Sequence, residues 1–169
     1  IVEIGNTEEI FTTPSHPWQK DRILEEKELT REYGLKNKKE IWKYSTKLSS
    51  ARNQVKKIIA NVRSEQAQKE KQELFDKLLR YSIISKDSSL DDILDLKIKD
   101  FLERRLQTIV FKKGLARSIN QARQFITHGH ILIEGQKITA PSYLISKDEE
   151  KKIQFLTTST LSKEDHPER

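Results

Sequence analysis

The sequence contains no cysteine among its 169 residues. Disulfide bonds, zinc sites built on thiolates and cysteine nucleophiles are therefore excluded. Histidine occurs four times, and His128 and His130 lie two residues apart rather than at the i, i+4 spacing of a helical zinc pair. We therefore expect neither a metal site nor a cofactor.

Long apolar runs are also absent, because no stretch approaches the roughly 18 to 20 residues of a membrane-spanning helix. No basic, apolar and small-residue signal peptide opens the chain. We expect a soluble, cytoplasmic protein with no membrane partner. Since the sequence begins at Ile1 rather than at methionine, we also expect its natural N-terminus to be missing or processed.

The motifs of common enzyme classes are missing as well. There is no glycine-rich phosphate loop, no nucleophile elbow and no His-Asp-Ser set. The acidic residues lie mainly on lysine-rich helices or at helix caps, where they do not form a catalytic pocket. We therefore expect no enzymatic activity and no small-molecule substrate.

Charge is abundant and unevenly distributed. Charged residues make up 34% of the chain, apolar residues another 34%, and the net charge is +6, which favours helices with wide solvated faces over one large core. Residues 101–137 hold seven basic and two acidic side chains, a net +5, whereas residues 1–100 hold 20 and 18. This clustering indicates a polyanionic partner, most simply a nucleic acid.

Helical patterns dominate the first two thirds of the chain. Residues 1–13 show no sustained period and are interpreted as a tail. Periodicity, caps and terminal glycines predict helices at residues 18–33, 41–62, 66–82, 90–96 and 101–113.

The second of these helices has a heptad-like seam, in which apolar residues from Ile41 to Val62 recur at alternating spacings of three and four. The rest of its surface is strongly basic. Three interpretations remain open from this pattern: a bundle helix with solvated lysines, a helix laid along phosphates, or a docking face for a partner helix.

Residues 115–139 carry the most distinctive pattern. Ser118 and Gln121 form a capping-box spacing that starts a helix at Ile119, and Gly129 ends it near His128. Its apolar arc is narrow, and the remaining arc consists of hydrogen-bonding side chains. Such a face, beside a helix N-terminus that favours phosphate, suits a nucleic acid, although a solvated face on an ordinary helix is the alternative.

Short strands follow this helix. "HILIEGQKIT" predicts a hairpin with its turn around Gly135-Gln136, and "SYLI" and "KKIQFL" predict further strands. The fold class is therefore α+β: an N-terminal helical region, then two short helices packed on a small antiparallel sheet.

Two stretches resemble a known family. "RRLQTIVFKKGLARSINQARQFITHGHILIEGQKITAPSYLI", residues 104–145, resembles the RNA-binding module named after ribosomal protein S-four. "HPWQKDRILEEKELTREYGLKNKKEIWKY", residues 16–44, is similar to the N-terminal region of the archaeal and eukaryotic S-four family. Residues 1–13 lack the basic arm with which family members usually open.

The resemblance implies a structural protein of the small ribosomal subunit that acts early in assembly. Its expected partners are the 5′ domain of the small-subunit rRNA, neighbouring ribosomal proteins and mRNA at the entry path. The expected division is a tail at 1–13, a helical rRNA-binding region at 14–100, the module at 101–158 and a tail at 159–169. A free ribosome-associated stress protein and an accessory module of an RNA-modifying enzyme are the alternatives.

The candidate RNA-binding residues form two sets, one implied by the resemblance and one added from charge and helical position. The resemblance implies contacts from Arg104, Arg105, Arg117, Ser118, Gln121, Arg123, Gln124, His128 and Lys137. Charge and helical position add Lys112, Lys113, Asn120, Lys43, Lys47, Arg52 and Lys56. Because Arg123 falls on the polar arc of its helix, its replacement by alanine is expected to weaken RNA binding without lowering the melting temperature.

Overall fold

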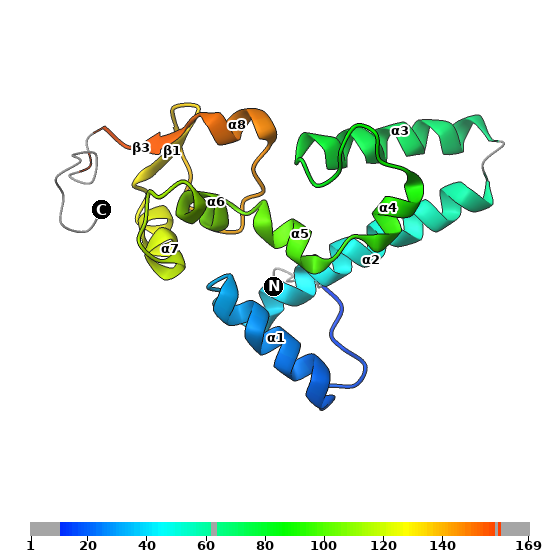
Figure 1. Ribbon diagram of the computed structural model, residues 1–169, viewed down its shortest axis with the longest axis horizontal. Coiled ribbons are helices and arrows are strands. Elements are labelled where there is room, and N and C mark those ends of the chain that lie inside the picture. The colour runs from blue at the N-terminus through cyan, green and yellow to red at the C-terminus, as the bar shows by residue number, and fades with distance from the viewer. Residues whose placement is uncertain (1–10, 62–63, 158, 160–169) are drawn as a thin grey trace, which may run out of the picture.

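The computed structural model describes residues 11–61, 64–157 and 159, and the remainder of the predicted tails and of the seam helix lies outside them. Its elements form two parts, a helical part and a smaller module (Figure 1). In chain order they are α1 Lys20–Glu32, α2 Lys38–Ala60, α3 Glu65–Arg80, α4 Leu90–Asp95, α5 Ile98–Glu103, α6 Leu106–Lys112, α7 Ile119–Thr127, β1 Ile131–Ile133, β2 Gln136–Lys137, α8 Lys147–Lys151 and β3 Ile153–Phe155.

Helix α2 is the spine of the helical part. The predicted seam is confirmed for its buried residues Ile41, Tyr44, Leu48, Val55 and Ile58. Ala51 is half-buried, and Val62 lies outside the described residues. The helices α1, α3, α4 and α5 of the same chain pack against α2. The seam is thus covered by the chain's own helices, which removes the support for a partner-helix docking face.

The prediction of one helix at residues 101–113 is wrong, because the helix is interrupted at residues 104–105, between α5 and α6. Arg105 has extended backbone angles and pairs with Leu144 in an isolated antiparallel bridge. The Ile145 amide donates to the Arg104 carbonyl at 3.0 Å. Backbone pairing with a distant segment therefore replaces the local helical hydrogen bonds at this point. Asp100 caps the start of α5, where its carboxylate accepts the Lys97 amide at 2.6 Å.

The module contains the predicted antiparallel sheet, in the order β2-β1-β3. Its hairpin turn is Glu134-Gly135, one residue earlier than predicted, with φ of 52° and 82°. Two consecutive positive φ values match the twist of a tight hairpin, and glycine adopts them without strain.

Two details of the predicted strands need correction. "SYLI" is not a strand and contributes only the bridge at Leu144. Of "KKIQFL", the lysines end the unpredicted helix α8 and only the apolar part forms β3. The start of α8 has a capping box in which Ser146 and Glu149 exchange hydrogen bonds, so the signal for this helix was present in "SKDE".

Two buried apolar clusters divide the chain. One lies in the helical part and runs as far as Leu102, and the other begins at Leu106 and fills the module. The apolar arc predicted for α7 is confirmed, because Ala122, Phe125 and Ile126 are all buried in the second cluster. None of the described helices is long and apolar enough to cross a membrane.

The Ser118 cap yields a first testable prediction. Its hydroxyl accepts the Gln121 amide at 3.1 Å, so Ser118→Ala should lower the free energy of unfolding by about 1 kcal/mol. Urea denaturation measures the change. Ser50→Ala is the control, because Ser50 is exposed within α2 and alanine is favoured in helix interiors. Equal stability of the two variants would show that the cap contributes nothing.

Candidate nucleic-acid interface

The polar face of α7 lies at the surface, as its wheel predicts. Asn120, Gln124 and His128 are exposed. The Gln121 side chain accepts the backbone amide of Arg117 at 2.7 Å, which orders the segment before the helix. Helix α7 therefore presents a row of donors and acceptors next to an N-terminus whose dipole favours negative charge.

Three lysines are placed on segments adjoining α7. Lys112 and Lys113 are exposed at the end of α6, which packs against α7. Lys112 lies 3.4 Å from Glu103, and Lys113 donates to the Glu150 carbonyl. The Lys137 side chain passes close to Gly129 at the end of α7. A Cβ atom added to Gly129 would lie only 1.8 Å from the Lys137 Cε. Two of the predicted lysines therefore lie at the end of the helix that packs against α7, and the third lies at the C-terminal end of α7.

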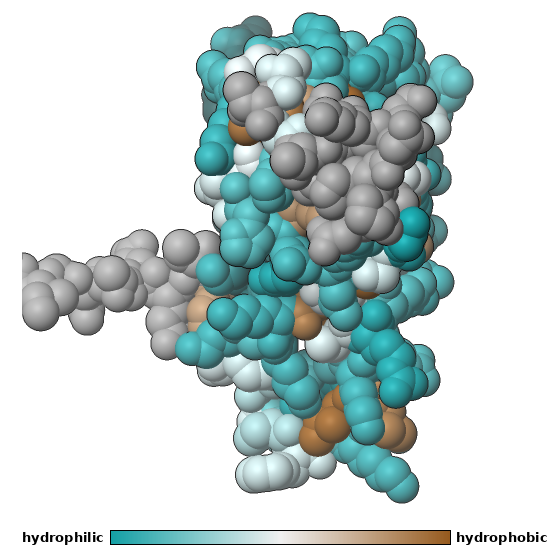
Figure 2. Space-filling view, turned by 90° about the vertical axis from the view of Figure 1, so that its left-hand side faces the viewer, coloured by the Kyte–Doolittle hydropathy of each residue, from teal (hydrophilic) through white to brown (hydrophobic). Residues whose placement is uncertain are grey.

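Figure 2 looks onto the module end of the molecule, where hydrophilic residues cover most of the coloured surface and hydrophobic ones occur in small patches. Burial agrees with this view, since the large exposed apolar side chains described are Trp18, Leu24, Ile59 and Phe111. Only Phe111 belongs to the module. This end is therefore suited to a polar or charged ligand rather than to an apolar one.

A second cationic surface runs along α2. Lys39, Lys43 and Lys47 recur every four residues on one face and are all exposed; we call them the lysine stripe. Although Lys47 is exposed as a residue, partial desolvation of its ammonium group by packed neighbours lowers its pKa, and repulsion from Lys77 and Lys43 lowers it further. Lys77, on α3, was not predicted from the sequence, because only packing brings it to α2.

The lysine stripe borders a groove of about 670 Å³ between the two parts of the molecule. Its opposite side is formed by the module, through Arg123, Pro141 and Ser142. Lys56, another predicted residue, is exposed farther along α2. Arg52 points inward instead, and its guanidinium donates to the Leu96 carbonyl at 2.6 Å.

Two predicted RNA-facing arginines are used inside the molecule. Arg105 is 1% exposed, and its Nη2 lies 2.7 Å from Oε2 of Glu40. Arg123 is 24% exposed, and its Nη2 lies 2.9 Å from Oε1 of the same carboxylate. A single side chain at the start of α2 therefore binds two arginines of the module, Arg105 and Arg123; we call this group the Glu40 clasp.

Neighbouring contacts close the junction around the clasp. The Arg105 guanidinium lies over the Tyr44 ring, 5.6 Å from its centroid, and the Tyr44 hydroxyl donates to the Ser142 carbonyl at 3.1 Å. Buried Gln107 donates to the carbonyls of Gly34 and Ile119, each at 3.0 Å.

Gly34 is required at this junction for two reasons. Its φ is +57°, a conformation that other residues rarely adopt, and it ends α1 as predicted. A Cβ there would lie 2.8 Å from Nε2 of Gln107 and 2.9 Å from Asn120. The turn between α1 and α2 is thus in direct contact with the module.

Electrostatics explains how a half-buried acid is kept charged in the clasp. Burial alone would raise the pKa of the Glu40 carboxyl, but hydrogen bonds and attraction from Arg123 and Arg105 outweigh it, and the net pKa lies below 4.5. Arg104 has a similar structural contact within the module, where its Nη2 lies 2.8 Å from Glu150.

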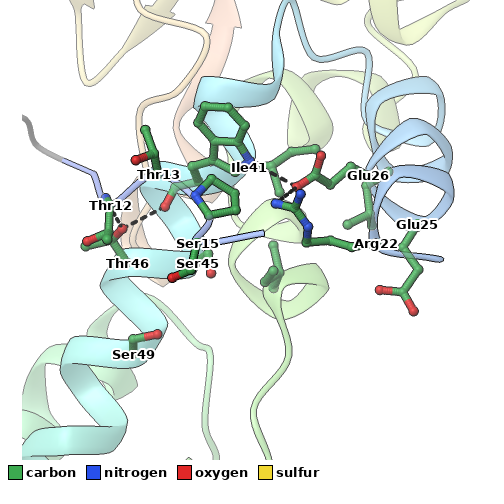
Figure 3. Close-up of a pocket in the computed structure, with 14 residues that line it drawn as sticks. Thr12, Thr13, Ser15, Arg22, Glu25, Glu26, Ile41, Ser45, Thr46 and Ser49 are labelled. Atoms are coloured by element: carbon green, nitrogen blue, oxygen red, sulfur yellow. Dashed lines mark hydrogen bonds and ion pairs between the residues drawn. The ribbon is translucent and has the colours of Figure 1, made fainter. Parts of the chain in front are cut away.

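A separate pocket of about 440 Å³ lies between α1, α2 and the segment before α1 (Figure 3). Buried Glu26 accepts hydrogen bonds from the Trp42 indole at 3.0 Å and from Arg22 at 3.4 Å. Arg22 in turn donates to the His16 and Pro17 carbonyls. These contacts fix α1 and its preceding segment on α2. The polar groups of this pocket therefore serve the packing of the helices, and we assign no ligand to it.

Sequence comparison finds a matching family model and close relatives among known proteins. Residues 104–151 match the family model described as "S4 domain". Over 160 residues the chain is 52% identical to "Small ribosomal subunit protein uS4" of Methanococcus aeolicus, covering 94% of this chain and 90% of the relative. It is 50% identical to the protein of the same name from Methanococcus maripaludis, covering 94% and 89%.

The clasp changes the expectation for Arg123. Because Arg123 pairs with partly buried Glu40, Arg123→Ala should lower the free energy of unfolding by about 2 kcal/mol, contrary to the unchanged stability expected from its position on the helical wheel. Urea denaturation tests this. Gln124→Ala, at the exposed neighbouring position, should change stability by less than about 0.5 kcal/mol. An unchanged Arg123→Ala variant would mean that the ion pair contributes nothing.

The lowered pKa of Glu40 also predicts a pH dependence. A carboxyl whose pKa is lower in the folded state contributes stability above its unfolded pKa, and this contribution disappears as pH falls through the folded value. The difference in unfolding free energy between wild type and Glu40→Gln should therefore be largest near neutral pH and shrink below pH 4.5. Denaturation across a pH series measures it, and a constant difference would contradict the charged clasp.

Proposed function

The chain belongs to the uS4 family of small ribosomal subunit proteins, and on this premise we propose that it binds a folded junction of the small-subunit rRNA through two cationic surfaces. It is a ribosomal structural protein and not an enzyme. The match over nearly the full length of its relatives argues against a free stress protein and against an accessory module of a modifying enzyme.

The groove between the two parts is the observation that carries this proposal. The lysine stripe forms one side of it, and Arg123 with the 141–142 segment forms the other. Both sides therefore face the same space, and helix α7 continues the second side into the module. An RNA backbone that lies along the groove would contact both parts at once.

The binding would rest on phosphates and shape. Lysine and arginine neutralise phosphates and release counterions, which makes affinity strongly dependent on salt. A-form RNA hides its major groove from side chains, so the amides and hydroxyls of α7 would read backbone and 2′-hydroxyl positions more than base sequence. Two linked surfaces raise the effective concentration of the second contact once the first has formed.

We assign the contacts by exposure. The proposed RNA-binding set is Lys39, Lys43, Lys47, Lys56, Lys112, Lys113, Arg117, Ser118, Asn120, Gln121, Gln124, His128 and Lys137, which the structure places at or near the surface. Arg52, Arg104 and Arg105 are left out, because they are half-buried or buried and their guanidinium groups bond within the protein. Arg123 borders the groove but acts first in the clasp.

The finer role follows from the family resemblance. The proposed partner is the 5′ domain of the rRNA, bound early in subunit assembly, with the protein near the mRNA entry path and beside other ribosomal proteins in the cytoplasm. Residues 14–100 would act as the helical rRNA-binding region and 101–158 as the S4 module. Phe101 and Leu102 pack in the helical cluster, so the packing boundary lies a few residues later.

Footprinting on the isolated rRNA 5′ domain tests this function, with excess tRNA as competitor and a series of salt concentrations. We expect protection confined to one multi-helix junction that survives tRNA and weakens steeply with salt. Diffuse protection that tRNA abolishes would reduce the protein to a general basic RNA binder and would overturn the proposal.

The lysine stripe gives a quantitative prediction for the same assay. If Lys43 and Lys47 each neutralise a phosphate, the double change to glutamine should reduce the slope of log affinity against log salt by about 2. The matched control is Lys20→Gln with Lys27→Gln, which removes two exposed charges from α1. Equal slopes for the two double variants would show that the lysine stripe makes no phosphate contact.

A further inference from the structure

We propose that Glu40 is a positioning residue for RNA binding: by holding Arg105 and Arg123 it fixes the S4 module against the helical part, so that both cationic surfaces fit one RNA. This inference rests on the proposed function and assigns a role in it to an acidic residue. Glu40 lines the groove as well, but each of its carboxylate oxygens already accepts a hydrogen bond from an arginine.

The connectivity of the clasp supports this role. Glu40 lies in the first turn of α2, whereas Arg105 begins α6 and Arg123 lies in the middle of α7. Each carboxylate oxygen binds a different arginine, at 2.7 and 2.9 Å. One side chain therefore connects the helix that bears the lysine stripe to the start of α6 and to α7.

Burial makes the connection costly to break. Arg105 is fully buried, and its Nε and Nη1 have no hydrogen-bond partner, so Glu40 is the acid that compensates its charge. Without that acid, two guanidinium groups would face each other in a partly desolvated junction. Their repulsion and their need for water would favour a displaced module.

The neighbouring contacts explain why displacement would alter the binding surface. Arg123 borders the groove together with the lysine stripe, and its Nη1 also donates to the Gly34 carbonyl at 3.2 Å. Movement of the module would therefore change the width of the groove and the angle between α7 and α2. A rigid arrangement matters because the gain from two linked contacts is lost when geometry prevents both from forming.

The sign of the expected effect separates this role from its alternatives. Removal of an acid from a basic RNA-binding protein ordinarily strengthens binding, because the positive field at its surface increases. If Glu40 merely competed with phosphate for Arg123, its removal would likewise strengthen RNA binding. A positioning role predicts the opposite, namely that loss of this negative charge weakens binding to the specific RNA.

The test compares the full chain and its Glu40→Gln variant for binding to the rRNA 5′ domain and to tRNA. We expect Glu40→Gln to bind the 5′ domain at least about tenfold more weakly and to bind tRNA equally or more tightly. Glu28→Gln is the matched control, because it removes one exposed acid from α1, and it should not weaken either complex.

A second measurement reports the orientation directly. Because the chain has no cysteine, Asn53→Cys on α2 and Gln136→Cys on β2 provide two unique exposed sites for spin labels. The distance distribution between them should be narrow in the otherwise wild-type protein and broader or shifted after Glu40→Gln. Tyr44→Phe, which removes only the hydroxyl bonded to Ser142, should produce a smaller effect in the same direction and does not alter charge.

The outcomes are distinct. If the wild-type chain shows no specific binding to the 5′ domain, the proposed function itself fails. If the wild-type chain binds but Glu40→Gln binds as tightly or more tightly, or if its label distances are unchanged, the positioning role is overturned while the function stands. If Glu40→Gln does not fold, Tyr44→Phe decides: weaker specific binding with a broader distance distribution supports the role, and wild-type behaviour overturns it.

Discussion

The arrangement of this protein depends on a carboxylate held between two arginines. Burying Arg105 removes a permanent charge from water, a cost that is acceptable only where an opposite charge and hydrogen bonds replace the lost hydration. Glu40 supplies that charge at 2.7 Å and uses its other oxygen for Arg123. Because the partners are 65 and 83 residues away along the chain, this local electrostatic requirement joins the start of α2 to the module.

Helix α2 combines this role with two others. Its apolar seam lies at spacings of three and four and packs inside the helical part, while the lysine stripe recurs every four residues and remains in water. Glu40 lies between Lys39 and the seam residue Ile41. One helix thus builds the first core, presents cations to the groove and holds the module, so changes in α2 are expected to affect folding and RNA binding together.

Local signals in the sequence account for much of the secondary structure. Ser118 and the glycine after α7 lie where the predicted cap and end require them, because caps depend on residues within a few positions. The break between α5 and α6 was missed for the opposite reason. It results from pairing of residues 104–105 with residues 144–145, about 40 positions away, and no local pattern reports such a partner.

The candidate site divides in the same way. Composition, helical periodicity and the family motifs determined that the protein has a polar α7 face and a basic α2 helix, because both patterns follow from the order of residues within one element. Only the tertiary structure decided which cations are available. It turned Arg105 and Arg123 toward Glu40, turned Arg52 toward Leu96 and brought Lys77 beside Lys47. An arginine looks the same in a sequence whether it meets a phosphate or a carboxylate, and its partner is known only when distant segments are packed together.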